Sequence, residues 1–391
     1  MIPYAGLLYF SLTLYTAVPA LLSGLMERLK LSRMWIVAVT ALMLVLQYGD
    51  APRLLLGAMV PELALVLSFA FAQYLIALVW LLIRRRAENR VLFWFALLLS
   101  LAPLVATRFV PLFAANQVVG FLGISYITFR SLDVLISVQD GLITTLPPVQ
   151  YLAFLLFFPT LSSGPVDRYR RFAMDWAHDR NRAELMQDIE MAVPRFFRGL
   201  LYKFILAALI KQYWLDPATY GTTLFDTLSY MYAYSFYLFF DFAGYSAFAI
   251  SLSYAFGIHS PENFRLPFVA HNIRDFWDRW HISLSTWFRD HVYMRFVMAA
   301  TQHHWFRQRQ FASYAGFALS MGLMGLWHGP ALHYLLYGAY HAMLLIGHDI
   351  FSQWNKRHKV LKGRLGSTVS ITVTFNAVCF GLLIFSGRLI L

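Results

Sequence analysis

The sequence predicts an all-α membrane protein that crosses the bilayer several times. Of its 391 residues, 59% are hydrophobic and 13% are charged, whereas charged residues make up roughly a quarter of an average soluble domain. Apolar runs follow one another along the chain with no long polar insert between them. We therefore expect a single membrane-embedded domain over residues 1–391, with about eleven transmembrane helices surrounding shorter re-entrant and interfacial helices.

The charge balance fits the same class. The chain has 32 basic and 20 acidic residues, a net charge of +12, and in a soluble protein such a surplus would suggest nucleic-acid binding. Here the basic residues cluster in short loops between apolar runs, as the positive-inside rule requires. We expect contacts with membrane lipids and with an acidic protein at the cytoplasmic face, and no contact with nucleic acid.

The first 110 residues hold four candidate spans, and basic loops set their direction. A span needs about 20 apolar residues, so the second candidate is short. Basic residues follow the first and third spans, which places both loops in the cytoplasm and the N-terminus outside the plasma membrane. The candidates are residues 4–22, 34–48, 63–83 and 91–107, and the basic residues are Arg28, Lys30, Arg33, Arg84, Arg85, Arg86 and Arg90.

The last span, residues 367–386, also follows a basic loop. It therefore runs from the cytoplasm outward, which places the C-terminus outside and makes the number of spans odd. The loop contains Lys356, Arg357, Lys359, Lys362 and Arg364.

The middle of the chain is less regular. Residues 118–138 are interrupted by Arg130 and Asp133, which can pair on one helix face. Residues 151–165 are too short for a full span and lead into the basic stretch SGPVDRYRRF, residues 163–172. We expect at least one of these segments to be re-entrant or broken. Residues 180–198 form a further amphipathic, interfacial segment.

Residues 228–258 are too long for one untilted span and carry a single charge, Asp241. We expect two helices that meet near Gly244. A carboxylate inside the membrane is a candidate functional group. The favoured alternative is structural: Asp241 would neutralise an interfacial arginine.

The most polar long segment, residues 271–298, predicts one amphipathic helix. Its apolar face and its charged face are well separated at 100° per residue, with His281 at their boundary. Such a helix lies at a membrane surface or lines a polar cavity. The apolar face comprises Ile273, Phe276, Trp277, Trp280, Leu284, Trp287 and Phe288, and the charged face comprises Asp275, Asp278, Arg279, Arg289 and Asp290.

Residues 311–348 contain no charged side chain but four histidines, His328, His333, His341 and His348. The spacing of His328 and His333 does not suit a metal site, and no accompanying Cys or carboxylate set is present. The sequence also lacks a GxSxG nucleophile elbow. The remaining role is that of a general base, for which a neutral imidazole in a protected cavity is suited.

His328 is the best placed of the four. It ends an uncharged run and precedes Gly329-Pro330, which breaks the helix and places the imidazole at a bend deep in the bilayer. The alternative for a membrane histidine is interhelical hydrogen bonding, and we expect that role for His333, His341 and His348.

Two segments resemble the membrane-bound O-acyltransferases: RDFWDRWHISLSTWFRDHVYMRF, residues 274–296, and GLWHGPALHYLLYGAYHA, residues 325–342. The stretches SGPVDRYRRF, FDFAGYSAFAI (240–250) and SPENFRLPF (260–268) resemble the branch of that family that transfers D-alanine to Gram-positive cell walls. The resemblance covers most of residues 118–350 as the family core and implies helices around a central tunnel. It implies that His328 is the catalytic histidine and His281 the second active-site histidine.

A second branch of the family acetylates polysaccharides such as alginate and shares the RWHISLS core. That branch usually has an Asp-Met pair where Ala247 and Phe248 stand here, and a proline- and glycine-bearing run where MRFVM follows Tyr293. Both departures favour D-alanyl transfer over O-acetylation. A flippase or channel for a lipid-linked intermediate, with histidines for proton coupling, is an alternative from another class.

The resemblance implies a donor, an acceptor and partners. The donor would be D-alanine as a thioester on the phosphopantetheine arm of a small acidic cytoplasmic carrier protein, with no cofactor bound to this chain. Lipoteichoic acid outside the cell would be the final acceptor, reached with the aid of extracytoplasmic helper proteins. His328 would be the general base, and His281 would hold the acceptor or assist proton transfer.

Further residues are predicted to contact the substrate or the carrier. Asn272 and Trp280 are candidate hydrogen-bond donors to the oxyanion, and Asp278 and Ser285 complete the predicted substrate site. Carrier docking is predicted at Met294, Val297 and Met298, whose i, i+3, i+4 spacing gives one helix face beside Arg289 and Arg295. The alternative for this face is a lipid-facing or core stripe.

Overall fold

The computed structural model describes residues 7–25, 32–49, 61–113, 120–162, 164–358 and 363–390. Within these ranges the regular elements are helices. In addition, one isolated antiparallel bridge pairs Phe264 with Trp280. Four of the described helices are long and apolar enough to cross a bilayer: Glu62–Arg86, Arg90–Pro111, Leu224–Ala255 and Gly363–Phe385. The predicted all-α polytopic membrane fold is confirmed. The number of about eleven spans and the central tunnel stay predictions.

The chain divides into two compact units. The first comprises Met1–Gly199 and Tyr245–Pro261, and the second comprises Leu200–Gly244 and Glu262–Leu391. Helix α12 (Leu224–Ala255) belongs to the second unit up to Gly244 and to the first unit from Tyr245 onward. The single domain expected over residues 1–391 stays a prediction.

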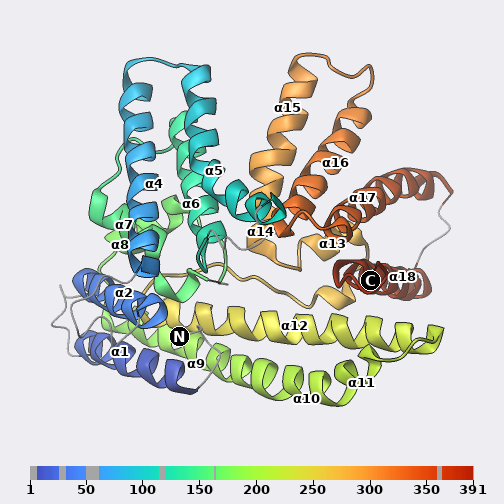
Figure 1. Ribbon diagram of the computed structural model, residues 1–391, viewed down its shortest axis with the longest axis horizontal. Helices are drawn as coiled ribbons and strands as arrows, with labels where there is room; N and C mark the ends of the chain where they lie inside the picture. Colours follow the sequence, from blue (N-terminus) through green and yellow to red (C-terminus); the bar gives the residue numbers. More distant parts are fainter. Residues whose placement is uncertain are drawn as a thin grey trace. The chain divides into compact units, whose positions relative to one another are not determined.

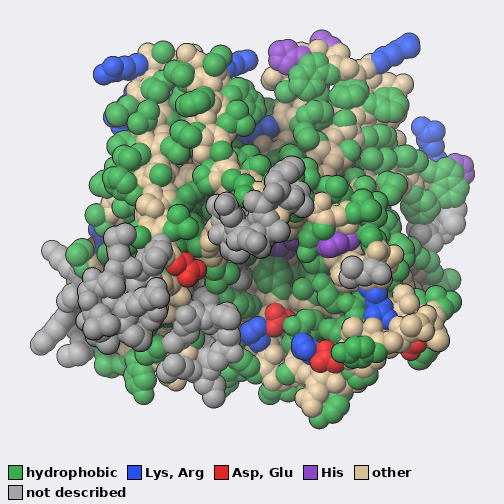
Figure 2. Space-filling view, in the orientation of Figure 1, with side chains coloured by type: hydrophobic (Ala, Val, Ile, Leu, Met, Phe, Trp, Pro, Cys, Tyr) green, Lys and Arg blue, Asp and Glu red, His purple; other side chains and the backbone are tan. Residues whose placement is uncertain are grey.

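The first unit begins with helices that match the predicted N-terminal spans: α1 (Leu7–Leu25), α2 (Ser32–Tyr48), α4 (Pro61–Arg86) and α5 (Arg90–Phe113). Helices α4 and α5 form an antiparallel hairpin (Figure 1). Figure 2 shows hydrophobic side chains over this hairpin. Phe71 and Trp94 are among its exposed residues. A helix pair that exposes so much apolar surface is suited to contact with lipid tails.

The orientation of the chain rests partly on residues that lie outside the described ranges, namely Arg28, Lys30, Lys359 and Lys362. The start of the first candidate span and Ser163 also lie outside these ranges. The location of both termini outside the membrane therefore stays a prediction.

The segment expected to be broken is broken. After α6 (Ile124–Gln139), helix α7 (Pro148–Leu156) stops and a 3₁₀ turn, η1 (Phe158–Thr160), follows. Arg130, which is 1% exposed, donates hydrogen bonds to the carbonyls of Phe154 (2.8 Å), Leu155 (3.0 Å) and Thr160 (2.8 Å). A helix end leaves such carbonyls without partners, so the buried guanidinium stabilises the irregular backbone.

The pair expected between Arg130 and Asp133 does not form. The guanidinium of Arg130 is directed at the carbonyls of the broken helix, and Asp133 accepts a hydrogen bond from Arg168 at 2.6 Å instead. The carbonyls of a broken helix could not have been located from spacing within one helix.

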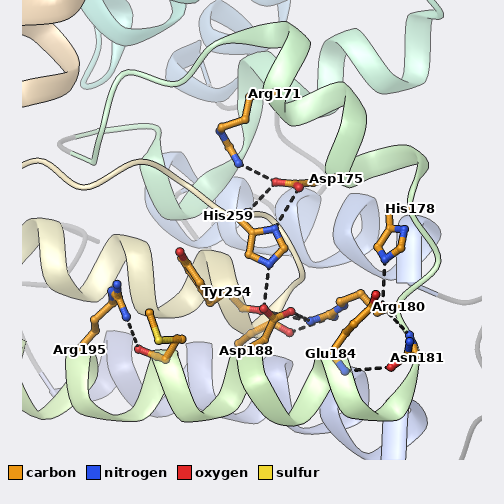
Figure 3. A network of polar contacts seen from close by, with 12 residues as sticks. Arg171, Asp175, His178, Arg180, Asn181, Glu184, Asp188, Arg195, Tyr254 and His259 are labelled. Atoms are coloured by element: carbon orange, nitrogen blue, oxygen red, sulfur yellow. Dashed lines mark hydrogen bonds and ion pairs between the residues drawn. The ribbon is translucent and has the colours of Figure 1, made fainter.

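A polar network joins α8 (Tyr169–Ala177), α9 (Arg182–Leu200) and the segment after α12 (Figure 3). His259 donates from Nδ1 to Asp175 (3.0 Å) and from Nε2 to Asp188 (2.8 Å). Arg171 and Arg180 bind the same two carboxylates, at 2.6 and 2.8 Å. The hydrogen bonds with Asp175, and then those with Asp188, raise the pKa of His259 to about 9. The imidazolium therefore links three segments of the first unit.

The predicted hinge at Gly244 is wrong, because α12 is one continuous helix. A Cβ atom at Gly244 would lie 2.8 Å from the backbone nitrogen of Lys203, so glycine permits the close approach of the π-helix η2 (Leu201–Ala207). Lys203 Nζ lies 2.5 Å from Asp241 Oδ1. The structural interpretation of Asp241 is thus supported, with a lysine in place of the expected arginine.

The second unit contains the histidine-bearing helices. After η2 come α10 (Ala208–Ile210), η3 (Lys211–Leu215) and α11 (Asp216–Thr219), which lead into α12. The short elements η4 (Pro267–Val269), α13 (Ile273–Trp277), α14 (Ile282–Phe288) and η5 (Arg289–Tyr293) follow. The chain then forms α15 (Met294–Gln302), α16 (Arg309–His328), α17 (Leu332–His358) and α18 (Gly363–Phe385). Helix α17 packs against both α16 and α18, so the ends of the three helices converge near His328.

We predict that the stability of the first unit decreases as the pH rises through about 9. The raised pKa of His259 means that its contribution is complete below the ordinary value of 6.5 and disappears once the folded imidazolium loses its proton. Thermal unfolding in micelles, measured between pH 7 and 10, should show this decrease, and His259→Gln should reduce it. An identical pH dependence in the variant would contradict the assignment.

Candidate active site

The predicted amphipathic helix over residues 271–298 is interrupted. It forms α13, α14, η5 and α15, with a break between Asp278 and His281. At the break the Arg265 N–H donates to the Arg279 carbonyl (3.0 Å), and the Ile282 N–H donates to the Asn263 carbonyl (3.0 Å). The prediction of one helix is therefore wrong, because a segment earlier in the chain supplies hydrogen-bond partners that replace those of the helix.

The predicted apolar face is nevertheless buried. All seven of its residues are at most 7% exposed, and they pack around the break rather than along one helix. Trp280, for example, stacks on Phe276 with ring centroids 5.6 Å apart and meets Phe264 edge-on at 5.1 Å. The hydrophobic pattern therefore predicted which residues are buried, although the segment does not form one helix.

His281 is held at this break. The residue is 6% exposed and adopts a left-handed backbone conformation with φ 45°. Its Nδ1 lies 3.1 Å from Oδ1 of Asn263, and its ring meets Phe242 edge-on at 4.8 Å. A non-glycine residue with positive φ persists only where its surroundings fix it, and such residues cluster at functional sites.

His281 and His328 lie within electrostatic range of each other. Burial, and then the charge of His328, lower the pKa of His281, which is therefore neutral at physiological pH. The two predicted catalytic histidines, 47 positions apart in the sequence, both belong to the second unit. Their meeting at one active site stays a prediction.

His328 is the last residue of α16, as the Gly-Pro pair predicted. The helix ends at Gly329, whose φ of 158° suits glycine, and Pro330 has no N–H to continue the helix. The half-buried imidazole faces aromatic rings of the next two helices: Phe385 at 4.8 Å, Tyr334 at 5.7 Å and Tyr337 at 6.3 Å. These rings limit the orientations available to the imidazole.

One cavity of about 360 Å³ brings together four of the predicted binding residues, Asp278, Ser285, Arg289 and Met294. Ser285 donates its hydroxyl to the Trp280 carbonyl (3.0 Å). The cavity therefore connects predicted substrate residues with predicted docking residues.

Asn272 lies apart from this cavity and lines another of about 660 Å³. Its Oδ1 caps α13 by accepting the N–H groups of Arg274 (3.0 Å) and Asp275 (2.9 Å), which leaves its amide hydrogens available. Trp280 lines neither cavity. The structure does not bring these two predicted oxyanion donors into one pocket.

The predicted docking face is partly exposed. Met294 and Met298 are 45% and 55% exposed on α15, next to Arg289. Val297 is half-buried and faces α16, because a Cβ atom at Gly316 would lie 3.0 Å from its Cγ2. The two methionines, rather than all three residues, form the accessible surface.

His341 differs from its predicted role. It is 1% exposed, and neither ring nitrogen has a hydrogen-bond partner in the described structure, so the expected interhelical hydrogen bond is absent. The ring instead packs against Tyr337 (4.5 Å) and Trp277 (5.1 Å). His333 contacts the ring of Tyr334 at 4.0 Å, and His348 lines the larger cavity.

Metal binding has no structural support in this part of the molecule. Among the described residues, no group of three or more His, Cys, Asp or Glu side chains is arranged to hold a metal ion. The chemistry available at the break is that of the His281 imidazole and the hydroxyl groups near it.

The family model of membrane-bound O-acyltransferases matches residues 57–382. The chain belongs to this family. It is 40% identical over 399 residues to the teichoic acid D-alanyltransferase of Bacillus subtilis, which covers 99% of this chain and 98% of that protein. Identity to the Lacticaseibacillus rhamnosus teichoic acid D-alanyltransferase is 36% over 407 residues, 99% of this chain and 97% of the other.

A probable alginate O-acetylase of Pseudomonas syringae is 35% identical over 230 residues, 57% of this chain and 42% of that protein. Membership of the membrane-bound O-acyltransferases and these relatives establish the chain as a membrane-embedded acyltransferase. The resemblance inferred from the RWHISLS and GLWHGP segments is confirmed.

Sequence reasoning missed Asn263, although it lies in the SPENFRLPF stretch. This asparagine is fully buried and binds His281, 18 positions later. The available signal was an amide beside a proline- and aromatic-rich segment, which by itself does not indicate a partner.

We predict that Gly381→Ala destabilises this acyltransferase. The new Cβ atom would lie 2.6 Å from Nε2 of His341, whose ring is confined by Tyr337 and Trp277. Overpacking of this kind costs about 1–3 kcal/mol. Thermal unfolding in micelles should therefore begin at a lower temperature.

Gly322→Ala on α16 is the matched control, because nothing lies within 4 Å of its Cβ position. Its stability should be unchanged or slightly increased. Equal unfolding temperatures for the two variants would refute the packing argument.

Proposed function

We propose that this acyltransferase transfers D-alanine from a carrier-protein thioester across the membrane toward lipoteichoic acid, with His328 as general base. The main support is that the chain aligns over nearly its whole length with both teichoic acid D-alanyltransferases, whereas it aligns over only part of its length with the alginate O-acetylase. The position of His328 at the end of α16, directly before the Gly329-Pro330 break, supports the choice of base. Polysaccharide O-acetylation is the second candidate, favoured only by the segment shared with that relative.

The proposed reaction is acyl transfer from sulfur to oxygen. The hydroxyl oxygen of the acceptor attacks the thioester carbonyl carbon, and the hydroxyl proton passes to His328. The carbon–sulfur bond then breaks, and the departing thiolate of the phosphopantetheine arm receives the proton from the imidazolium. An acyl ester and a free thiol result, so no bound cofactor or oxidant is needed.

The cavity of about 360 Å³ suits an aminoacyl donor. Asp278 is the one acidic side chain among the described residues that line it, beside Arg274 and Arg289, and its carboxylate would be the group that binds the ammonium of D-alanine. Ser285 provides a hydroxyl near the break, and the free amide hydrogens of Asn272 suit a second, separate contact. An acetyl donor lacks an ammonium group and would gain nothing from Asp278.

The membrane position follows from the charges. Basic residues end α4 and α17, at Arg84–Arg86 and Lys356–Arg357, and such ends remain in the cytoplasm. The arm would enter from that side, the acceptor would enter from outside, and helper proteins would complete delivery to lipoteichoic acid. Both termini of the chain would lie outside the plasma membrane.

The carrier would dock at Met294 and Met298. Exposed methionines suit an adaptable protein contact, and Arg289 lies in the same cavity lining as Met294. No acidic residue occurs between Asp290 and Asp349, whereas this stretch contains Arg295, Arg307 and Arg309. This excess of basic residues would attract an acidic carrier, and the two methionines would provide the apolar part of the contact.

We predict that purified protein in micelles consumes the thioester of an aminoacylated carrier when a hydroxyl acceptor is present. Loss of the general base in His328→Ala should reduce the rate by about 10²–10⁴-fold. His358→Ala, at the exposed end of α17, is the control and should retain the rate.

Three outcomes separate the candidate functions. Consumption that is independent of His328 would remove it as the base. Preference for an acetyl donor over the D-alanyl donor would favour the O-acetylation candidate. Transport of a lipid-linked intermediate without any loss of thioester would favour the flippase or channel.

We predict that Met294→Glu and Met298→Glu each abolish carrier binding while the protein stays folded, because a carboxylate would repel an acidic partner from the apolar contact. Binding is measured by copurification of the carrier with detergent-solubilised protein. Met174→Glu, at a methionine 66% exposed on α8, should leave binding intact. Undiminished binding by the α15 variants would exclude this docking surface.

A further inference from the structure

The side chain of Asn263 is 0% exposed, and its oxygen faces three nitrogen or oxygen donors. Ser283 directs its backbone N–H (3.3 Å) and its hydroxyl (2.8 Å) at Oδ1, and His281 Nδ1 lies 3.1 Å from the same atom. A backbone N–H can only donate, so the atom that it meets is the amide oxygen and not the amide nitrogen. An amide oxygen can only accept. The hydrogen of the His281 ring is therefore on Nδ1.

The location of this hydrogen determines what His281 can do. In a neutral imidazole protonated on Nδ1, Nε2 carries a lone pair and acts only as an acceptor. Two features keep the ring neutral: it is buried, and it stands at the N-terminus of α14, where the helix dipole disfavours a positive charge. His328 is the titratable group whose charge acts on it.

The two residues are also fixed by their backbones. The Asn263 carbonyl accepts the Ile282 N–H at 3.0 Å, and the Phe264–Trp280 bridge continues the pairing of the two segments. The edge-on contact with Phe242 also restrains the imidazole. Asn263 therefore holds both the ring orientation and the tautomer of His281.

We propose that Asn263 is a positioning residue that keeps His281 neutral with its ring hydrogen on Nδ1, so that Nε2 of His281 acts only as a hydrogen-bond acceptor during acyl transfer. This inference rests on the proposed function and narrows it. The acceptor hydroxyl has one proton, which passes to His328, and Nε2 has no hydrogen to offer an oxyanion. Its lone pair is thus suited to accept a hydrogen bond from an O–H or N–H donor at the site.

The decisive variants are Asn263→Asp and Asn263→Leu, assayed by thioester consumption as a function of pH. Aspartate keeps an oxygen for Nδ1–H but adds a negative charge, which favours a protonated His281. The acidic limb of the pH–rate profile should move upward by about 1 unit or more, with the full rate recovered at high pH. Leucine removes the acceptor, so kcat should fall by about 10–100-fold at every pH with KM values for carrier and acceptor unchanged.

Gln73→Leu is the matched control. Gln73 is a buried amide in the first unit that exchanges hydrogen bonds with Ser100, at 3.0 and 2.6 Å. Its loss removes a comparable polar contact from the interior, yet it should leave kcat and the pH profile unchanged. The comparison separates positioning of His281 from a general loss of stability.

The outcomes are distinguishable. An Asn263→Asp profile that superimposes on that of the unsubstituted protein overturns the inference, even where Asn263→Leu fails to fold. Full kcat in Asn263→Leu overturns it as well. In both cases His328-dependent consumption by the unsubstituted protein leaves the proposed function intact, whereas an absence of consumption overturns the proposed function and this inference together.

Discussion

The short antiparallel pairing of residues 263–265 with residues 279–282 is the interaction on which the site depends. It interrupts what would otherwise be a continuous helix and satisfies the exposed backbone groups at the break. The same pairing places Asn263 next to His281 and buries Trp280 against Phe264. Without it, His281 would lie on the rim of an amphipathic helix, with no partner to orient its ring.

A related constraint governs the irregular backbone of the first unit. Carbonyl groups at membrane depth must find donors within the protein, because lipid offers none. Arg130 provides them at the end of α7, and a buried guanidinium is tolerated there because its N–H groups are directed at three carbonyls. Breaks in helices are thus supported by specific side chains in both units, an arginine in one and an asparagine in the other.

The sequence was informative where the physical signal was local. Continuous apolar runs predicted α4, α5 and α18 to within a few residues, and Gly329-Pro330 predicted the end of α16 at His328. The apolar face of residues 271–298 was recognised because burial depends on side-chain periodicity. The break in the helix was not predicted. It depends on Phe264, which pairs with Trp280 from 16 positions earlier, and no local pattern reveals that pairing.

The predictions of polar pairs and of the role of Gly244 failed for the same reason: the partners are distant in the sequence. Lys203 neutralises Asp241 from 38 positions away, and Gly244 permits that approach rather than bending its own helix. For the candidate site, the catalytic roles of the two histidines stay predictions, and the orientation of His281 depends on Asn263. Which nitrogen of a buried imidazole carries a hydrogen is set by a tertiary contact, so it is not readable from spacing or composition.

The left-handed backbone at His281 has one more consequence. An L-residue in this region costs about 1 kcal/mol relative to glycine, and asparagine enters it more readily than most side chains. His281→Gly and His281→Asn should therefore be at least as easy to accommodate in the chain path as the native histidine. Any loss of activity in these two variants would then come from the missing imidazole and not from strain in the backbone.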